Sequence, residues 1–200
     1  MFTDEEGGAA VRIARTTVDE FTRTKRRPQV KEYPRVFEQN SGAFTTLSTY
    51  PGNELRGCIG LPLPRQPLID ALVESAMSAT QDPRFPPLSP SELDSIVVEV
   101  TVLSPLEVIQ ARTPKEIIQK IRIGRDGLYL ESGWYSGLLL PQVPVEYGWD
   151  NEEYLAHLSI KAGMAADGWT RSGVKISRFS GDVFHESEPR GRVVREELVK

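Results

Sequence analysis

The single cysteine of the chain, Cys58, lies in the segment LRGCIG, beside an arginine and between two glycines. In an extended strand, Arg56, Cys58 and Gly60 share one face, with Arg56 about 6.6 Å from Cys58 along the strand. A guanidinium at that range favours the thiolate form of a cysteine. Gly57 and Gly60 lack side chains, so another backbone or a ligand can come close there.

Two interpretations of Cys58 stay open. It is either a thiolate nucleophile, redox thiol or ligand contact, or a small apolar residue packed in a strand. A thiol nucleophile usually needs a base, and the chain has only His157 and His185. A Cys58–His157 dyad is conceivable, although two scattered histidines make a weak signature. One cysteine and two distant histidines, without HxxxH or CxxC spacing, predict no metal site.

The segment DPRFPPL, residues 82–88, is rich in proline, which restricts the backbone. A stiff loop can present Arg84 to an anion and Phe85 to a flat ring, next to Pro86. Alternatively, Phe85 closes the end of a sheet.

A third candidate segment is YGWDNEEYLAHLSIKAG. Trp149 precedes Asp150, which is placed to cap a helix whose third position is Glu153. Lys161 lies near the end of that helix. It either interacts with the helix dipole or points at a carboxylate or phosphate of a ligand.

Capping patterns and apolar spacing predict the elements that position these residues. Helices are expected to begin after Thr3, at Leu68, after Thr113 and after Asp150. Strands are expected in two hairpins, one on either side of YPGN and one in DGLYLESGWYSGLLLP, at Ile96–Leu103 and in a last strand, VKISRFSGDVFHE, with a bend at Ser180 and Gly181.

Both halves of the chain follow the order hairpin, proline-rich crossing, helix, which indicates an internal duplication. The tight hairpins favour an α+β fold with a mostly antiparallel sheet over a doubly wound parallel one. We therefore expect one domain over residues 1–185, with half-repeats at about 37–110 and 120–185. The charged segment 186–200 is expected to be a poorly ordered tail.

Composition narrows the classes of function. The 200 residues are 39% hydrophobic, enough for a substantial core, and the net charge of -4 argues against salt-driven nucleic-acid binding. The basic stretch at residues 23–31 is interpreted as a solvated linker. The chain has no glycine-rich phosphate-binding motif. One cysteine, an acidic beginning and no apolar run of membrane length predict a cytoplasmic protein without a membrane partner.

The segments LRGCIG, DPRFPPL, GLLLPQV, GWD and KAG, in this order, resemble the AMMECR domain family. The likeness runs from about the first helix to GDVF. It implies an α+β fold in which two β3α2 repeats share one barrel-like sheet flanked by helices. The family's biochemical activity is not established. Members are suspected of enzymatic or regulatory roles, and some are associated with a radical-SAM protein and a Memo-type protein. One departure is Ser159, where many relatives carry cysteine.

Two main hypotheses about function follow, with nucleic-acid binding through residues 23–31 as a distant third. In the first, a cleft binds an anionic or planar small molecule, and Cys58 with Arg56 does the chemistry. In the second, the same segments form a non-catalytic surface for a protein partner. The sequence names no cofactor and no substrate. The expected binding residues are Gly57, Gly60, Arg84, Phe85, Pro86, Gln142, Trp149, Asp150 and Lys161.

Overall fold

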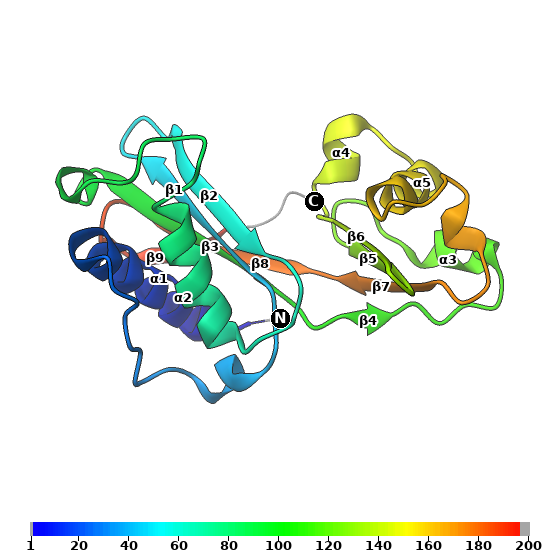
Figure 1. Ribbon diagram of the computed structural model, residues 1–200, viewed down its shortest axis with the longest axis horizontal. Helices are drawn as coiled ribbons and strands as arrows, with labels where there is room; N and C mark the ends of the chain where they lie inside the picture. Colours follow the sequence, from blue (N-terminus) through cyan, green and yellow to red (C-terminus); the bar gives the residue numbers. More distant parts are fainter. Residues whose placement is uncertain (1, 197–200) are drawn as a thin grey trace. The chain divides into compact units, whose positions relative to one another are not determined.

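The computed structural model describes residues 2–196, which form two compact units (Figure 1). Unit 1 comprises residues 2–103 and 182–196, and unit 2 comprises residues 104–181. The chain therefore passes from unit 1 to unit 2 and back once. The fold is α+β with antiparallel pairing, as the sequence predicted.

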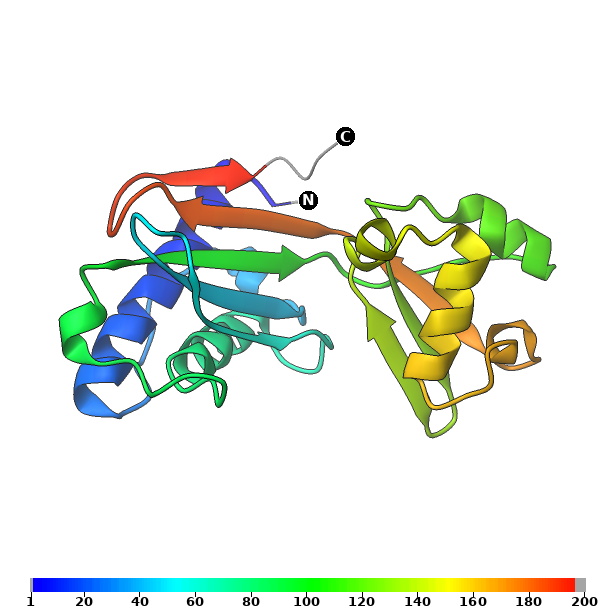
Figure 2. The same cartoon turned by 90° about the horizontal axis from the view of Figure 1, so that it is seen from above.

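Unit 1 is built on a five-stranded sheet with the order β2-β1-β3-β8-β9. Its strands are β1 (Ala43–Thr49), β2 (Leu55–Leu61), β3 (Ile96–Leu103), β8 (Gly181–Glu186) and β9 (Val193–Glu196). Its helices are α1 (Asp4–Thr24) and α2 (Leu68–Ala79), with short 3-10 turns η1 (Arg35–Glu38) and η2 (Pro90–Glu92). Both long helices cover the same face of the sheet (Figure 2). On that face, the register partners Leu47 and Val98 are fully buried.

Unit 2 contains a four-stranded sheet with the order β4-β7-β5-β6. Its elements are β4 (Glu107–Val108), α3 (Pro114–Lys120), β5 (Gly127–Ser132), β6 (Tyr135–Leu139), α4 (Val143–Tyr147), α5 (Asn151–Lys161), η3 (Gly168–Thr170) and β7 (Lys175–Phe179). Its core joins Leu128 and Leu130 of β5 to Tyr154, Leu155 and Leu158 of α5.

The predicted helix starts are confirmed, and local capping hydrogen bonds explain those of α1, α3 and α5. The Glu6 amide donates to Thr3 Oγ1 at 3.2 Å, and the Thr3 amide donates to Glu6 Oε2 at 2.7 Å. This reciprocal capping satisfies backbone donors that a helix leaves free at its beginning. Asp150 and Glu153 cap α5 in the same way. Both predicted hairpins and the predicted strand Ile96–Leu103 are also present.

The expectation of one barrel-like sheet is wrong, because the strands form two separate sheets. The last predicted strand divides at Ser180 into β7, in the four-stranded sheet, and β8, in the five-stranded sheet. There the Ser104 amide donates to the Ser180 carbonyl at 2.8 Å, and the Ser180 amide donates to Ser104 Oγ at 2.9 Å. Tertiary hydrogen bonding thus fixes the break that Gly181 only suggested. The interpretation of residues 1–185 as one domain with two half-repeats stays a prediction.

The expectation of a poorly ordered tail from residue 186 is wrong for the part that the structure describes. Glu186 is buried and accepts hydrogen bonds from Arg15. After a turn, β9 pairs antiparallel with β8. Arg195 of β9 donates to Asp4 and to Asp182, at 2.8 and 2.7 Å. Arg15 and Asp4 lie 171 and 191 positions away from their partners in the sequence, so local charge density does not reveal them. Residues 197–200 lie outside the described residues.

Candidate thiol site on the five-stranded sheet

Cys58 is half-buried on β2, an edge strand of the five-stranded sheet. Its register partner on β1 is Thr46, whose Oγ1 donates a hydrogen bond to Cys58 Sγ at 3.4 Å. Thr45, the residue before Thr46 on β1, forms a hydrogen bond with Ser75 of α2 and so points to the helix-covered face. Because side chains alternate along a strand, Cys58 and Thr46 lie on the opposite face of the sheet.

The two glycines beside Cys58 leave room for protein atoms. A Cβ on Gly57 would lie 2.3 Å from the Ala79 carbonyl oxygen at the end of α2. A Cβ on Gly60 would lie 2.0 Å from the ring of Phe44, its register partner on β1. The predicted close approach at these positions is therefore made by a helix end and an aromatic ring.

Gly57→Ala is expected to lower the stability of unit 1 by about 1–3 kcal/mol, because its methyl group meets backbone that cannot turn away. Gly60→Ala should cost less, since the half-buried Phe44 ring can rotate. Urea unfolding followed by circular dichroism measures both. Gly52→Ala, in the exposed hairpin turn, is the control. Equal midpoints for Gly57→Ala and Gly52→Ala would contradict the packing role of Gly57.

The loop 82–87 is fixed to the outer edge of β2 at Cys58 itself. Asp82 Oδ2 accepts from the Cys58 amide at 2.9 Å, and Arg84 Nη2 donates to the Cys58 carbonyl at 3.2 Å. Asp82 and Arg84 also form an ion pair at 2.6 Å. Both outward backbone groups of Cys58 are thus satisfied, which protects an otherwise open strand edge. Pro86 is exposed on this loop.

Hydrogen bonds from Arg84 hold the pKa of Asp82 far below its usual range. The Cys58 and Arg84 amides add to this effect, and burial of the carboxyl opposes it. Asp82 is only 2% exposed, whereas the Arg84 side chain is 57% exposed. The hydrogen bonds to Asp82 raise the pKa of Arg84, burial opposes this, and the nearby Cys58 adds a smaller increase. Arg84 is therefore a solvent-accessible cation close to the thiol.

Arg56 is tied to a different partner. Its Nε and Nη2 donate to the two carboxylate oxygens of Glu92, at 2.7 and 3.2 Å. This bidentate pair, with help from Ser89, lowers the pKa of Glu92 to about 2. The Phe85 ring lies 6.0 Å from the Arg56 guanidinium and 5.7 Å from that of Arg84. Because Glu92 neutralises Arg56, the main effect of Arg56 is to anchor η2 and Phe85 next to β2.

A row of polar side chains crosses the sheet from Cys58. Thr46 pairs with Cys58 on one side and with Glu99 of β3 on the other. His185 follows on β8, the next strand, where Phe184 points into the core beneath α1. Burial and the negative charge of Glu196 raise the pKa of Glu99, whereas His185 and a hydrogen bond with Thr46 lower it by less. Sequence reasoning missed Asp82, Thr46 and Glu99, because only strand register and the loop path bring them to Cys58.

Four predicted binding residues belong to unit 2 and are described there by themselves. Asp150 accepts from the amides of Glu152 and Glu153 and caps α5. The Trp149 ring stacks on His157 at 3.8 Å and on Tyr147 at 5.0 Å. The other two, Gln142 before α4 and Lys161 at the end of α5, are exposed. Their participation with Cys58 in one cleft, and the Cys58–His157 dyad, stay predictions.

Ser159, the departure from the cysteine of many relatives, has a structural role. Its buried hydroxyl donates to the Leu155 carbonyl at 3.1 Å and accepts from the Trp169 amide at 3.0 Å. These bonds join α5 to η3 in unit 2.

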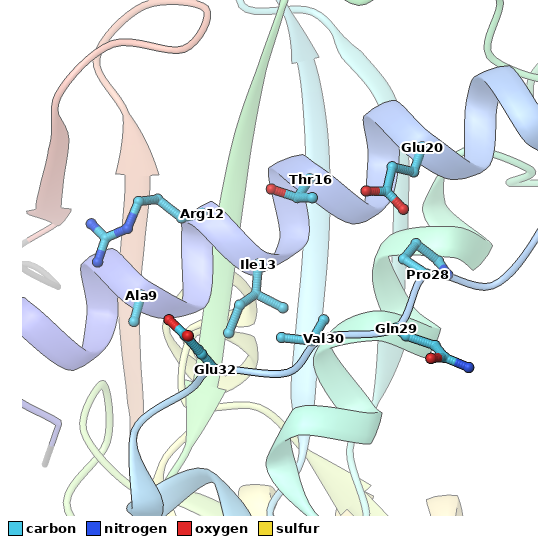
Figure 3. Close-up of a pocket in the computed structure, with 9 residues that line it drawn as sticks. All are labelled: Ala9, Arg12, Ile13, Thr16, Glu20, Pro28, Gln29, Val30 and Glu32. Atoms are coloured by element: carbon cyan, nitrogen blue, oxygen red, sulfur yellow. The ribbon is translucent and has the colours of Figure 1, made fainter.

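A cavity of about 280 Å³ lies between α1 and the extended chain that follows it (Figure 3). Its lining includes Arg12, Thr16 and Glu20 of α1 and Gln29 and Glu32 of that chain. Because α1 covers the other face of the sheet, this cavity is distinct from the thiol site. Nearby, Arg27 of the basic stretch pairs with Asp70 at 2.9 Å.

Within residues 2–196, no three His, Cys, Asp or Glu side chains are grouped so that they could hold a metal ion. Over the same range, every helix is too short or too polar to cross a membrane.

Comparison with known proteins identifies relatives over the whole chain. A family model described as AMMECR1 matches residues 11–184. A protein of Methanocaldococcus jannaschii, Protein MJ0810, is 56% identical over 200 residues, covering 100% of this chain and 99% of that protein. A protein of Thermococcus gammatolerans is 48% identical over 202 residues, covering 98% of each.

Among solved structures, the crystal structure of the uncharacterized protein PH0010 from Pyrococcus horikoshii matches with a TM-score of 0.79 and 44% identity. The match covers 98% of this chain and 99% of that one. The names of these relatives state no activity. The chain belongs to the AMMECR1 family.

Proposed function

We propose that unit 1 carries a thiol-dependent small-molecule site, in which Cys58 attacks an electrophilic ligand that has an anionic or planar group. The carrying observation is the environment of Cys58 Sγ, which is half-buried, accepts a hydrogen bond from Thr46 and lies close to the exposed Arg84. A hydroxyl donor and a guanidinium both stabilise a thiolate.

The reaction class that suits this group is acyl transfer. The thiolate electron pair forms an S–C bond to a carbonyl carbon, and the leaving group departs with the electrons of its own bond to that carbon. Arg84 is paired with Asp82, but its guanidinium is exposed, unlike that of Arg56, and can still donate to an anionic part of the ligand. Phe85 is available to a flat part. Both residues are held in place by Asp82 and by the Arg56–Glu92 pair.

The proposal predicts that p-nitrophenyl acetate acylates Cys58 in the native protein. A burst of p-nitrophenolate stoichiometric with protein is expected, with a thioester on Cys58 in the mass spectrum. Cys58→Ser should abolish both signals while leaving the circular dichroism spectrum unchanged. A thiol that reacts only after unfolding in guanidinium would show that Cys58 is a packing residue and would refute the proposal.

A second candidate is a non-catalytic binding module. It is favoured by the loop 82–87, whose backbone is fixed by Asp82 and whose Phe85 ring lies beside two guanidinium groups. Such a loop can meet a protein partner with little loss of conformational entropy. Radical-SAM and Memo-type proteins are the partners that the family resemblance implies. If Cys58 of the native protein does not react with p-nitrophenyl acetate, the binding module becomes the favoured candidate.

A further inference from the structure

We propose that Glu99 is the general base for Cys58 and that the Thr46 hydroxyl carries the proton between them. This inference rests on the proposed function, because it concerns the same thiol. It supplies a base for Cys58 from within unit 1.

The order of the strands keeps His185 out of direct contact with the thiol. His157 belongs to unit 2, where its ring stacks on Trp149, and its pairing with Cys58 stays a prediction. His185 lies on β8, three strands from β2, which corresponds to about 14 Å at the usual spacing between strands. Glu99 is two strands away, and Thr46 occupies the position between Glu99 and Cys58.

The single hydrogen of the Thr46 hydroxyl can be donated either to Cys58 or to Glu99, and this links the two titratable groups. A threonine hydroxyl has one hydrogen to donate and can accept others. When Thr46 donates to the Cys58 sulfur, as in this structure, its oxygen is free to accept from a protonated Glu99. When Glu99 is ionised, Thr46 can donate to the carboxylate and accept from the thiol.

The transfer is therefore balanced. The S–H bond of Cys58 breaks as its proton moves to Thr46 Oγ1, and the original Thr46 hydrogen moves to a Glu99 carboxylate oxygen. Thr46 ends neutral, Cys58 carries the negative charge, and Glu99 is a neutral acid. Reversal of the same steps returns a proton to the sulfur or to a leaving group bound next to it.

The surroundings of Glu99 favour its protonated form, which a base must adopt when it accepts a proton. The groups that face it are Thr46 on β1, His185 on β8 and Glu196 on β9, with Cys58 beyond Thr46. Burial and Glu196 raise the pKa of Glu99 and bring it closer to that of a thiol, which reduces the cost of the transfer. His185 Nδ1 lies 3.1 Å from the Glu186 carbonyl, which can only accept. Nδ1 therefore carries the hydrogen of that bond.

The test measures the rate at which iodoacetamide alkylates Cys58 as a function of pH. Two groups that share one proton titrate as a pair, so the wild-type profile should rise in two steps separated by a shoulder. Glu99→Gln should rise in one step. Near neutral pH it should react on the order of tenfold more slowly than wild type, because no base then takes the thiol proton as the sulfur attacks. A faster reaction would mean that the Glu99 carboxylate only repels the thiolate, and it would overturn the relay.

Thr46→Val should slow alkylation on the order of tenfold, because the thiolate loses its hydroxyl donor. Thr46→Ser should restore the wild-type profile. Glu188→Gln removes the same charge from the exposed turn between β8 and β9 and should leave the profile unchanged. If Glu99→Gln does not fold, the pair Thr46→Val and Thr46→Ser carries the test.

The outcomes separate this inference from the proposed function. A native, reactive Cys58 whose profile is the same single step in wild type and in Glu99→Gln overturns the relay and leaves the thiol site intact. Thr46→Val with wild-type rates also overturns the relay. A wild-type Cys58 that reacts with neither iodoacetamide nor p-nitrophenyl acetate while folded overturns the proposed function itself.

Discussion

Arg15→Met is expected to destabilise unit 1 by about 3–5 kcal/mol, since it breaks a buried ion pair and leaves one charge behind. The Arg15 side chain is 7% exposed and donates two hydrogen bonds to Glu186. It also donates to the carbonyls of Leu93 and Ile96, at 3.1 and 2.8 Å. Methionine fills the space of the aliphatic stem but replaces none of these donors. Glu186 would keep only the Val98 amide, at 3.0 Å.

Urea unfolding measured by circular dichroism tests this expectation. Arg12→Met, an exposed position on the same helix, is the matched control and should change stability by less than about 0.5 kcal/mol. The double variant Arg15→Met/Glu186→Leu should recover part of the loss, because no unpaired charge is then buried. If Arg15→Met and Arg12→Met unfold at the same urea concentration, the Arg15–Glu186 pair does not hold β8 and α1 together.

The helices were predictable from the sequence because the interactions that start them are local. Thr3 and Glu6, or Asp150 and Glu153, lie three residues apart and satisfy each other's backbone donors. The strand Ile96–Leu103 was predictable for a related reason, since its alternate valines all face the core. In these elements, the residues that determine the structure are close neighbours in the chain.

The arrangement of the strands in two sheets depended on contacts that are distant in sequence. Glu186 meets Arg15 across 171 positions, and Ser180 meets Ser104 across 76. A charged composition after residue 186 therefore suggested disorder where the chain forms β9. A charged composition indicates that a segment has too little apolar surface to fold by itself, but it does not reveal distant residues that pair with the segment and order it.

The candidate site was predictable only in part. Cys58, Arg84 and Phe85 stood out by residue type, and the structure brings them together in unit 1. Arg56 was expected to serve the thiol, yet it is committed to Glu92, which lies 36 positions away. Thr46 and Glu99 are ordinary polar residues of strands. They become significant only through the register that aligns them with Cys58.

Asp82→Asn is expected to cost about 2–3 kcal/mol near neutral pH, because charge-assisted hydrogen bonds to the Cys58 amide and to Arg84 are weakened at a buried position. The loop 82–87 should then detach from the edge of β2. Native-state hydrogen exchange should show faster exchange at the Cys58 amide, and urea unfolding should show the loss of stability. Asp70→Asn is the matched control, since Asp70 also pairs with an arginine but is half exposed. Its effect should stay below about 1 kcal/mol.

The pH dependence distinguishes the ionised carboxylate from a merely polar side chain at position 82. Because folding depresses the pKa of Asp82 below its ordinary value of 3.8, the stabilisation by its carboxylate is fully present above that value and is lost as the pH falls through the lower folded pKa. The stability difference between wild type and Asp82→Asn should therefore be constant from about pH 5 to pH 8 and should shrink below about pH 4. A difference that stays constant down to about pH 2 would mean that shape and hydrogen bonding, rather than charge, hold the loop against Cys58.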